Sequence, residues 1–85
     1  MKTQTKLNVI SLFTLFVNFE INVNELIYRL KTYKPNFFVR FNGSPIIYTK
    51  NELITDLSLP FTHKNKDYIV ELINIAVKNN KIQIL

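Results

Sequence analysis

Residues 36–48 read NFFVRFNGSPIIY, two apolar runs separated by the dipeptide Asn42-Gly43. This dipeptide is a strong signal for a two-residue turn between antiparallel strands, because both residues tolerate the positive φ angles that such a turn needs. The first run, Asn36–Phe41, is rich in aromatic and β-branched side chains, which favour strands. We therefore expect a strand here, a tight turn, and a return strand through Pro45–Tyr48.

The preceding segment, Asn22–Tyr33, predicts an amphipathic helix. Its apolar residues recur at three- and four-residue spacing, which places them on one helical face. Asn22 and Glu25 have the spacing of a capping box, and Pro35 ends the run. The apolar face consists of Val23, Leu26, Ile27, Leu30 and Tyr33.

The first apolar segment, Leu7–Phe19, allows two interpretations. Its richness in Val, Ile, Leu, Phe and Thr favours a buried strand, whereas its polar residues at 8, 11, 14 and 18 also fit a helical period. These polar interruptions argue against a targeting signal, and the segment is too short to span a bilayer.

The residues after Tyr48 are also ambiguous. Alternating Leu53, Thr55, Leu57 and Leu59 continue the strand pattern, but Thr49 and Glu52 could instead cap a short helix over 50–57.

The last third of the chain predicts a loop, a helix and a strand. The polar, basic segment Pro60–Asp67 predicts a projecting loop. A second amphipathic helix follows and ends near Asn79-Asn80, and residues 82–85 form a short final strand. The apolar face of this helix consists of Ile69, Leu72, Ile73, Ala76 and Val77.

The predicted order is strand, helix, strand, strand, helix, strand, within a single domain over residues 1–85. The fold class that we expect is α+β: a mainly antiparallel sheet with two helices on one face, in the ferredoxin-like order β-α-β-β-α-β. A long hairpin with a basic tip completes this expectation.

Composition argues for a binding protein and against an enzyme. Eleven Lys and Arg against six Asp and Glu give a net charge of +5, which favours a polyanionic partner. The absence of Cys and the presence of only one His leave no thiolate or two-His metal site, so we expect no metal and no cofactor. Scattered carboxylates and a single Gly indicate no catalytic pair and no phosphate-binding glycine loop. We expect no small-molecule substrate and no membrane partner.

The basic residues offer the candidate site. Lys64 and Lys66 flank Asn65, directly after His63, on the predicted loop. Such donors suit phosphate oxygens and ribose 2′-hydroxyls, although the same residues could form an ordinary solvated face. The predicted RNA-binding set is Lys50, His63, Lys64, Asn65, Lys66 and Arg40. Phenylalanines that could stack on bases or belong to the core are Phe37, Phe38, Phe41 and Phe61, of which Phe61 lies beside the basic loop.

The stretch from Gly43 to Asp67 resembles the tenth small-subunit ribosomal protein, the S-ten family. That family has a run of the form G-P-I-P-L-P-T-[RK]-x-E-x-[FY]-T-V-L-x-S-P-H-x-x-K. Two later prolines of the motif fall on Ile47 and Tyr48, and the basic strand that normally follows the His-containing loop is missing. The matching residues are Gly43, Pro45, Ile46, Thr49, Lys50, Glu52, Ile54, Thr55, Leu57, Pro60, His63 and Lys66.

The resemblance implies a structural constituent of the small ribosomal subunit. Members of the family send the loop that corresponds to 58–67 into the rRNA of the head and contact neighbouring ribosomal proteins. Asn, Ile, Lys, Phe and Tyr are abundant and Ala and Gly are scarce, as in proteins from AT-rich genomes. Together these features predict a divergent mitochondrial member, located in the organelle.

Two other functions stay open. One is a phage-encoded inhibitor that binds a host protein in the bacterial cytoplasm, because Asn22–Leu30 and Tyr68–Asn79 resemble helices of an anti-CRISPR inhibitor of Cas nucleases. Such inhibitors are often acidic, unlike this chain. The other is an accessory subunit of another organellar complex.

Overall fold

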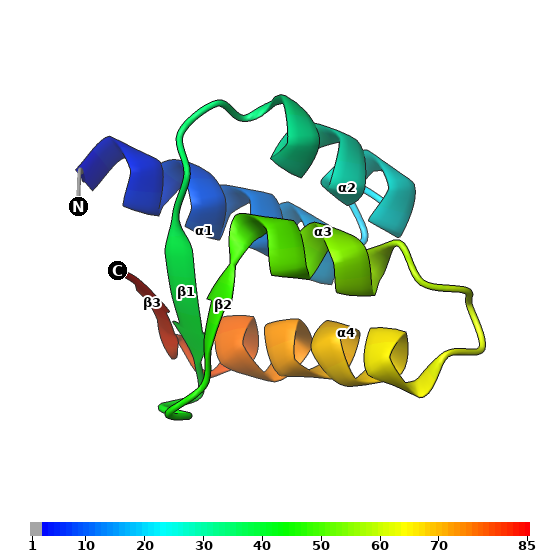
Figure 1. Ribbon diagram of the computed structural model, residues 1–85. Helices are drawn as coiled ribbons and strands as arrows, with labels where there is room; N and C mark the ends of the chain where they lie inside the picture. Colours follow the sequence, from blue (N-terminus) through cyan, green and yellow to red (C-terminus); the bar gives the residue numbers. More distant parts are fainter. Residues whose placement is uncertain (1–2) are drawn as a thin grey trace.

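The computed structural model describes residues 3–85, which form four helices and three strands (Figure 1). The α+β class predicted from the sequence is confirmed. In chain order the elements are α1 (Thr3–Val17), α2 (Val23–Thr32), β1 (Phe38–Phe41), β2 (Ile47–Thr49), α3 (Lys50–Leu57), α4 (Lys64–Lys78) and β3 (Ile82–Ile84).

The sheet has the strand order β2-β1-β3, and both pairs are antiparallel. β1 pairs with β2 in the antiparallel sense that residues 36–48 predict, with Val39 opposite Tyr48. Because Arg40 pairs with Ile47, the connection is longer than the two-residue turn that we expected. The turn that begins at Asn42 and Gly43 has φ angles of 57° and 72°, the left-handed values that this dipeptide tolerates. β3 completes the sheet on the other side of β1.

The first apolar segment is a helix, so the strand that we expected for Leu7–Phe19 is wrong. Val9, Phe13 and Val17 are spaced four residues apart and are all buried, which forms one helical face. Thr14 fits the helix because its hydroxyl donates to the Ile10 carbonyl at 2.8 Å. The ferredoxin-like order, which begins with a strand, is therefore not observed.

The region after Tyr48 follows the second of its two interpretations. Thr49 accepts a hydrogen bond from the Glu52 amide, and the Glu52 carboxylate accepts one from the Thr49 amide, a complete capping box at the start of α3. α4 begins at Lys64, inside the segment predicted as a loop. The long hairpin with a basic tip is not present in residues 3–85, because the short segment 58–63 links two helices.

The core lies between the sheet and the helices, which pack against one face of it (Figure 1). Phe41 on β1 is central: its ring lies 5.9 Å from that of Phe13 and 5.8 Å from that of Tyr48. α2 contributes Leu26 and Leu30 from the face that the sequence predicts. The helices thus leave the opposite face of the sheet uncovered.

Candidate functional site

Charged residues are distributed unevenly along the long dimension of the molecule. The sheet lies at one end and the segment linking α3 to α4 at the other (Figure 1). We call residues 3–10, 31–53 and 72–85 the sheet half, and residues 11–24 and 54–71 the loop half. The sheet half has one acidic residue, Glu52, and seven basic ones: Lys6, Lys31, Lys34, Arg40, Lys50, Lys78 and Lys81.

The loop half has the opposite balance. It has two lysines and four carboxylates, so its net charge is negative. Between the halves, Arg29 and Glu25 form an ion pair at 2.8 Å on α2. The charged residues of the loop half are Lys64, Lys66, Glu20, Asp56, Asp67 and Glu71. The positive charge of the described residues is thus concentrated at the sheet.

The uncovered face of the sheet presents a row of three side chains. Arg40 on β1 lies opposite Ile47 on β2 and Gln83 on β3, and its Nη1 donates to Gln83 Oε1 at 3.2 Å. Phe38, two residues earlier on the same face, is 45% exposed. An aromatic ring and a planar guanidinium on an open, positively charged sheet suit stacking with unpaired nucleic acid bases.

The structure separates the six residues of the predicted site. Arg40 and Lys50 lie in the sheet half, and the other four lie at the far end of α4. Lys50 is already engaged, because its Nζ donates to the carbonyls of Tyr33 at 2.7 Å and Pro35 at 3.1 Å. These two hydrogen bonds connect the residues after α2 to the start of α3.

The four residues from His63 to Lys66 form the first turn of α4 and its cap, not the tip of a loop. His63 is the N-cap, and its Nδ1 accepts from the Asn65 amide at 3.1 Å. Lys66 Nζ donates to the Leu59 carbonyl at 3.1 Å. The side chains of Lys64 and Asn65 are exposed and make no hydrogen bond to the described residues, and Asp67 follows within the same turn.

The loop half has an apolar groove of about 530 Å³ between α1, α2 and α4. Phe16, Val23 and Val70 line it, with Asp67 and Glu71 at the polar side. Phe61 also borders it and is 86% exposed. Exposed aromatic side chains beside an apolar groove are typical of surfaces that bind proteins.

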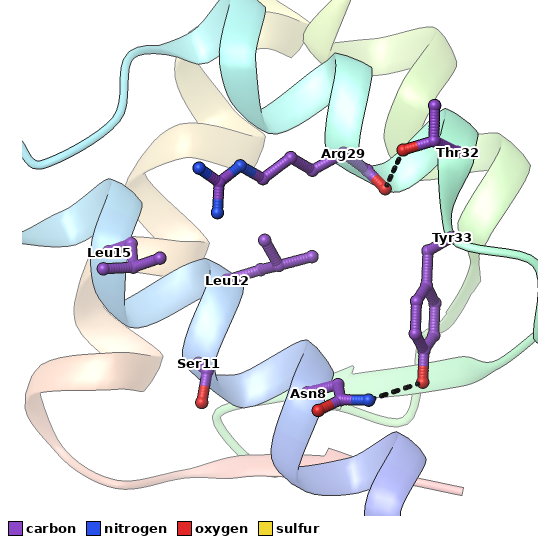
Figure 2. Close-up of a pocket in the computed structure, with 7 residues that line it drawn as sticks. All are labelled: Asn8, Ser11, Leu12, Leu15, Arg29, Thr32 and Tyr33. Atoms are coloured by element: carbon purple, nitrogen blue, oxygen red, sulfur yellow. Dashed lines mark hydrogen bonds between the residues drawn. The ribbon is translucent and has the colours of Figure 1, made fainter.

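A second groove, of about 410 Å³, separates α1 from α2 (Figure 2). Leu12 is part of its apolar lining, and Asn8 Nδ2 donates to the Tyr33 hydroxyl at 3.4 Å across one end. Its one charged residue, Arg29, extends from α2 into the gap (Figure 2). Arg29 also pairs with Glu25 on the same helix. Among the residues that line this groove, Arg29 is the one that is charged at neutral pH.

The phenol of Tyr48, on β2, has a shifted pKa. Burial raises the pKa of the Tyr48 phenol above 10.0, helped by the charges of Tyr68, Asp56 and Glu52. Within residues 3–85, no three His, Asp or Glu residues lie close enough together to hold a metal ion. None of the helices described has the length and hydrophobicity needed to cross a bilayer.

With this geometry described, we compared the chain with known proteins. No protein-family model, curated protein or solved structure matches it. The functional inference therefore depends on the charge distribution and the open sheet.

The basic character of the sheet half is visible in the sequence, although the predicted RNA-binding set contained only two of its seven basic residues, Arg40 and Lys50. No acidic residue occurs between Glu25 and Glu52, or after Glu71. Those two acid-free stretches fold into the sheet and its surroundings. The predicted RNA-binding set was centred on the predicted loop at 60–67. It therefore did not include Lys78, Lys81 or Phe38.

Proposed function

We propose that this protein binds RNA, without catalysing a reaction, on the sheet half and its uncovered sheet face. The observation that carries the proposal is the separation of charge: seven basic residues and one acidic residue share the half that contains the sheet. Phosphate contacts from Lys and Arg supply most of the affinity for nucleic acid. Glu52 is the one acidic residue among the described residues of this half, so there is little negative charge there to repel a bound strand.

Single-stranded segments of RNA suit this surface best. The uncovered face consists of three short strands, with Phe38 and Arg40 available to stack on splayed bases. Five of the seven basic residues of the sheet half are exposed: Lys6, Lys31, Lys34, Lys78 and Lys81. Flexible lysines would follow the sugar-phosphate backbone, with little dependence on base sequence.

The RNA that we propose is small-subunit ribosomal RNA of a mitochondrial ribosome, with neighbouring ribosomal proteins as further partners. This part of the proposal rests on the resemblance of residues 43–67 to the S-ten family. The helix at Lys50–Leu57 and the helical first segment depart from that family's expected layout. The identity of the RNA is therefore tested separately from RNA binding.

The test is a binding measurement across a salt series. Three ligands are compared: a fragment of the small-subunit rRNA head, a scrambled RNA of equal composition, and duplex DNA. Binding to both RNAs with a steep salt dependence supports RNA binding, and preference for the rRNA fragment supports the ribosomal assignment. Weak, equal binding to all three ligands would contradict both.

Two lysines on the same helix provide a matched pair of variants. Lys64 is the first residue of α4 and Lys78 is the last, and both are exposed. Lys78→Gln should weaken RNA binding and reduce the slope of log affinity against log salt by about 0.7, whereas Lys64→Gln should change neither. If Lys64→Gln weakened RNA binding more than Lys78→Gln did, the binding surface would lie at the first turn of α4 and not on the sheet half.

A second candidate function is inhibition of a host protein. The apolar groove beside Phe61 and the acidic excess of the loop half favour it. Phe61→Ala distinguishes the two functions, because Phe61 lies outside the sheet half. The substitution should leave RNA binding unchanged, whereas an inhibitor that uses the groove would lose affinity for its target.

A further inference from the structure

A polar pocket of about 300 Å³ lies at the edge of the sheet, where the turn after β1 meets the turn before β3. The Asn42 amide donates to the Lys81 carbonyl at 2.9 Å, which joins the two turns. Its lining contains no acidic residue. The lining includes Arg40, Asn42, Gly43, Asn80, Lys81 and Gln83.

Two buried polar atoms of this lining have no hydrogen-bond partner. One is Arg40 Nε, a donor, and the other is Asn42 Oδ1, an acceptor. The side-chain nitrogen of Asn42, Nδ2, donates to the Leu72 carbonyl at 3.4 Å. This bond fixes the orientation of the side-chain amide and leaves its oxygen, Oδ1, without a partner. Leaving such groups unpaired is unfavourable, which makes them candidates for contact with a ligand.

The backbone around the pocket is held in an unusual conformation. Asn42, Gly43 and Asn80 all have positive φ angles, between 54° and 72°. Gln83 Oε1 accepts a hydrogen bond from Arg40 Nη1 at 3.2 Å, which orients the guanidinium. The unpaired donor and acceptor therefore belong to two residues that each make one other side-chain hydrogen bond.

A ligand that fills the pocket must both accept and donate hydrogen bonds and must tolerate positive charge. A phosphodiester group alone accepts hydrogen bonds and tolerates positive charge, but it has no O–H or N–H to donate to Asn42 Oδ1. A ribonucleotide meets all three, because its phosphate accepts from Arg40 and Lys81 while its 2′-hydroxyl can donate to an amide oxygen. Deoxyribose lacks that hydroxyl.

We propose that this pocket seats one nucleotide of a bound RNA strand and recognises its 2′-hydroxyl through Asn42. The inference rests on the proposed RNA-binding function and adds a means of distinguishing RNA from DNA. Both unpaired atoms are shielded from solvent in the free protein. Seating the nucleotide therefore requires a small movement of the Arg40 side chain and of the turn at Asn42.

The experiment uses decamers of oligouridylate and oligodeoxyuridylate, which differ only in the 2′-hydroxyl. The variant is Asn42→Gly, because glycine accepts the φ of 57° that Asn42 adopts. The wild type should prefer RNA by about fivefold, the effect of one hydrogen bond, and Asn42→Gly should lose that preference through weaker RNA binding alone. Arg40→Gln should weaken both ligands, and thermal unfolding of both variants tests whether they are folded.

The outcomes separate this proposal from the one it rests on. Equal binding of RNA and DNA by the wild type, or an RNA preference that survives Asn42→Gly, would overturn the pocket assignment and leave RNA binding intact. Failure of both decamers to bind would overturn both proposals. Uridine monophosphate is the third ligand: if it bound more tightly than the RNA decamer, the ligand would be a free nucleotide and not a strand.

Discussion

At the scale of single residues, Phe41 and Tyr48 connect the sheet to the helices. Phe41 is 1% exposed and packs edge-on against Phe13 of α1. Tyr48 packs against the other side of Phe41 and is only partly buried. The two rings thus place the inner face of the sheet against the helices and leave its outer face, with Arg40, toward solvent.

Shortening Phe41 should destabilise the domain without altering its charge. Phe41→Leu should lower the free energy of unfolding by about 1–2 kcal/mol, because the smaller side chain leaves space beside Phe13 and Tyr48. Urea denaturation followed by circular dichroism measures the change. Phe38→Leu, on the uncovered face, is the control and should cost less; equal losses would show that Phe41 has no special place in the core.

The raised pKa of Tyr48 predicts a dependence of stability on pH. Well below pH 10 the phenol is neutral in both states, so its contribution is fully present there. As pH rises further, the unfolded chain loses this proton first, and stability falls until the folded-state pKa is passed. Tyr48→Phe should lose less stability than the wild type between about pH 9 and pH 11. Identical pH profiles in chemical denaturation would contradict this.

At the scale of elements, the ends of helices decide where the chain turns. α1 ends at Val17, and the Glu20 amide donates back to the Leu15 carbonyl at 2.9 Å. The residue before Glu20 is Phe19, with φ 62° and 92% of its surface exposed. Glycine usually occupies this left-handed position after a helix, because a Cβ atom is strained there.

Replacing Phe19 by glycine should therefore stabilise the protein. Phe19→Gly removes the strain and loses little packing, so we expect a gain of about 1 kcal/mol, measured by urea denaturation. Phe19→Ala is the matched control, since it removes the ring but keeps the Cβ atom and should bring no gain. A loss of stability in the glycine variant would indicate that the Phe19 ring contributes to the fold.

The capping box of α3 predicts a second effect at a helix end. Thr49→Ala removes the acceptor that binds the Glu52 amide at 3.1 Å and should cost about 1 kcal/mol in unfolding free energy. Thr49→Ser retains the hydroxyl and should cost much less. If both variants unfolded at the same urea concentration as the wild type, the cap would contribute nothing to stability.

Elements also show what could be predicted from the sequence. α2 and the pairing of β1 with β2 followed from local signals, a capping residue and an Asn-Gly turn. Residues 7–19 had no such signal, since β-branched residues favour a strand while the four-residue spacing of Val9, Phe13 and Val17 favours a helix. Packing against the other helices decides between them, and one sequence does not reveal that packing.

At the scale of the whole molecule, the fold separates charges that alternate along the chain. The predicted site combined residues that lie near opposite ends of α3 and α4, such as Lys50 and Lys64. Their distance could not be foreseen, because the sequence left open whether residues 50–57 continue a strand or form a short helix. The acid-free stretches 26–51 and 72–85 were visible in the sequence, but only the sheet brings them together.

This separation of charge leads to the claim that RNA binds the sheet half. The most direct measurement is a titration of the ¹⁵N-labelled protein with the RNA decamer, followed by NMR. Amide shift changes should concentrate at residues 38–49 and 78–85, while residues 54–67 stay constant. Changes concentrated at 58–67 would move the binding surface to the start of α4, and no changes at RNA excess would contradict RNA binding itself.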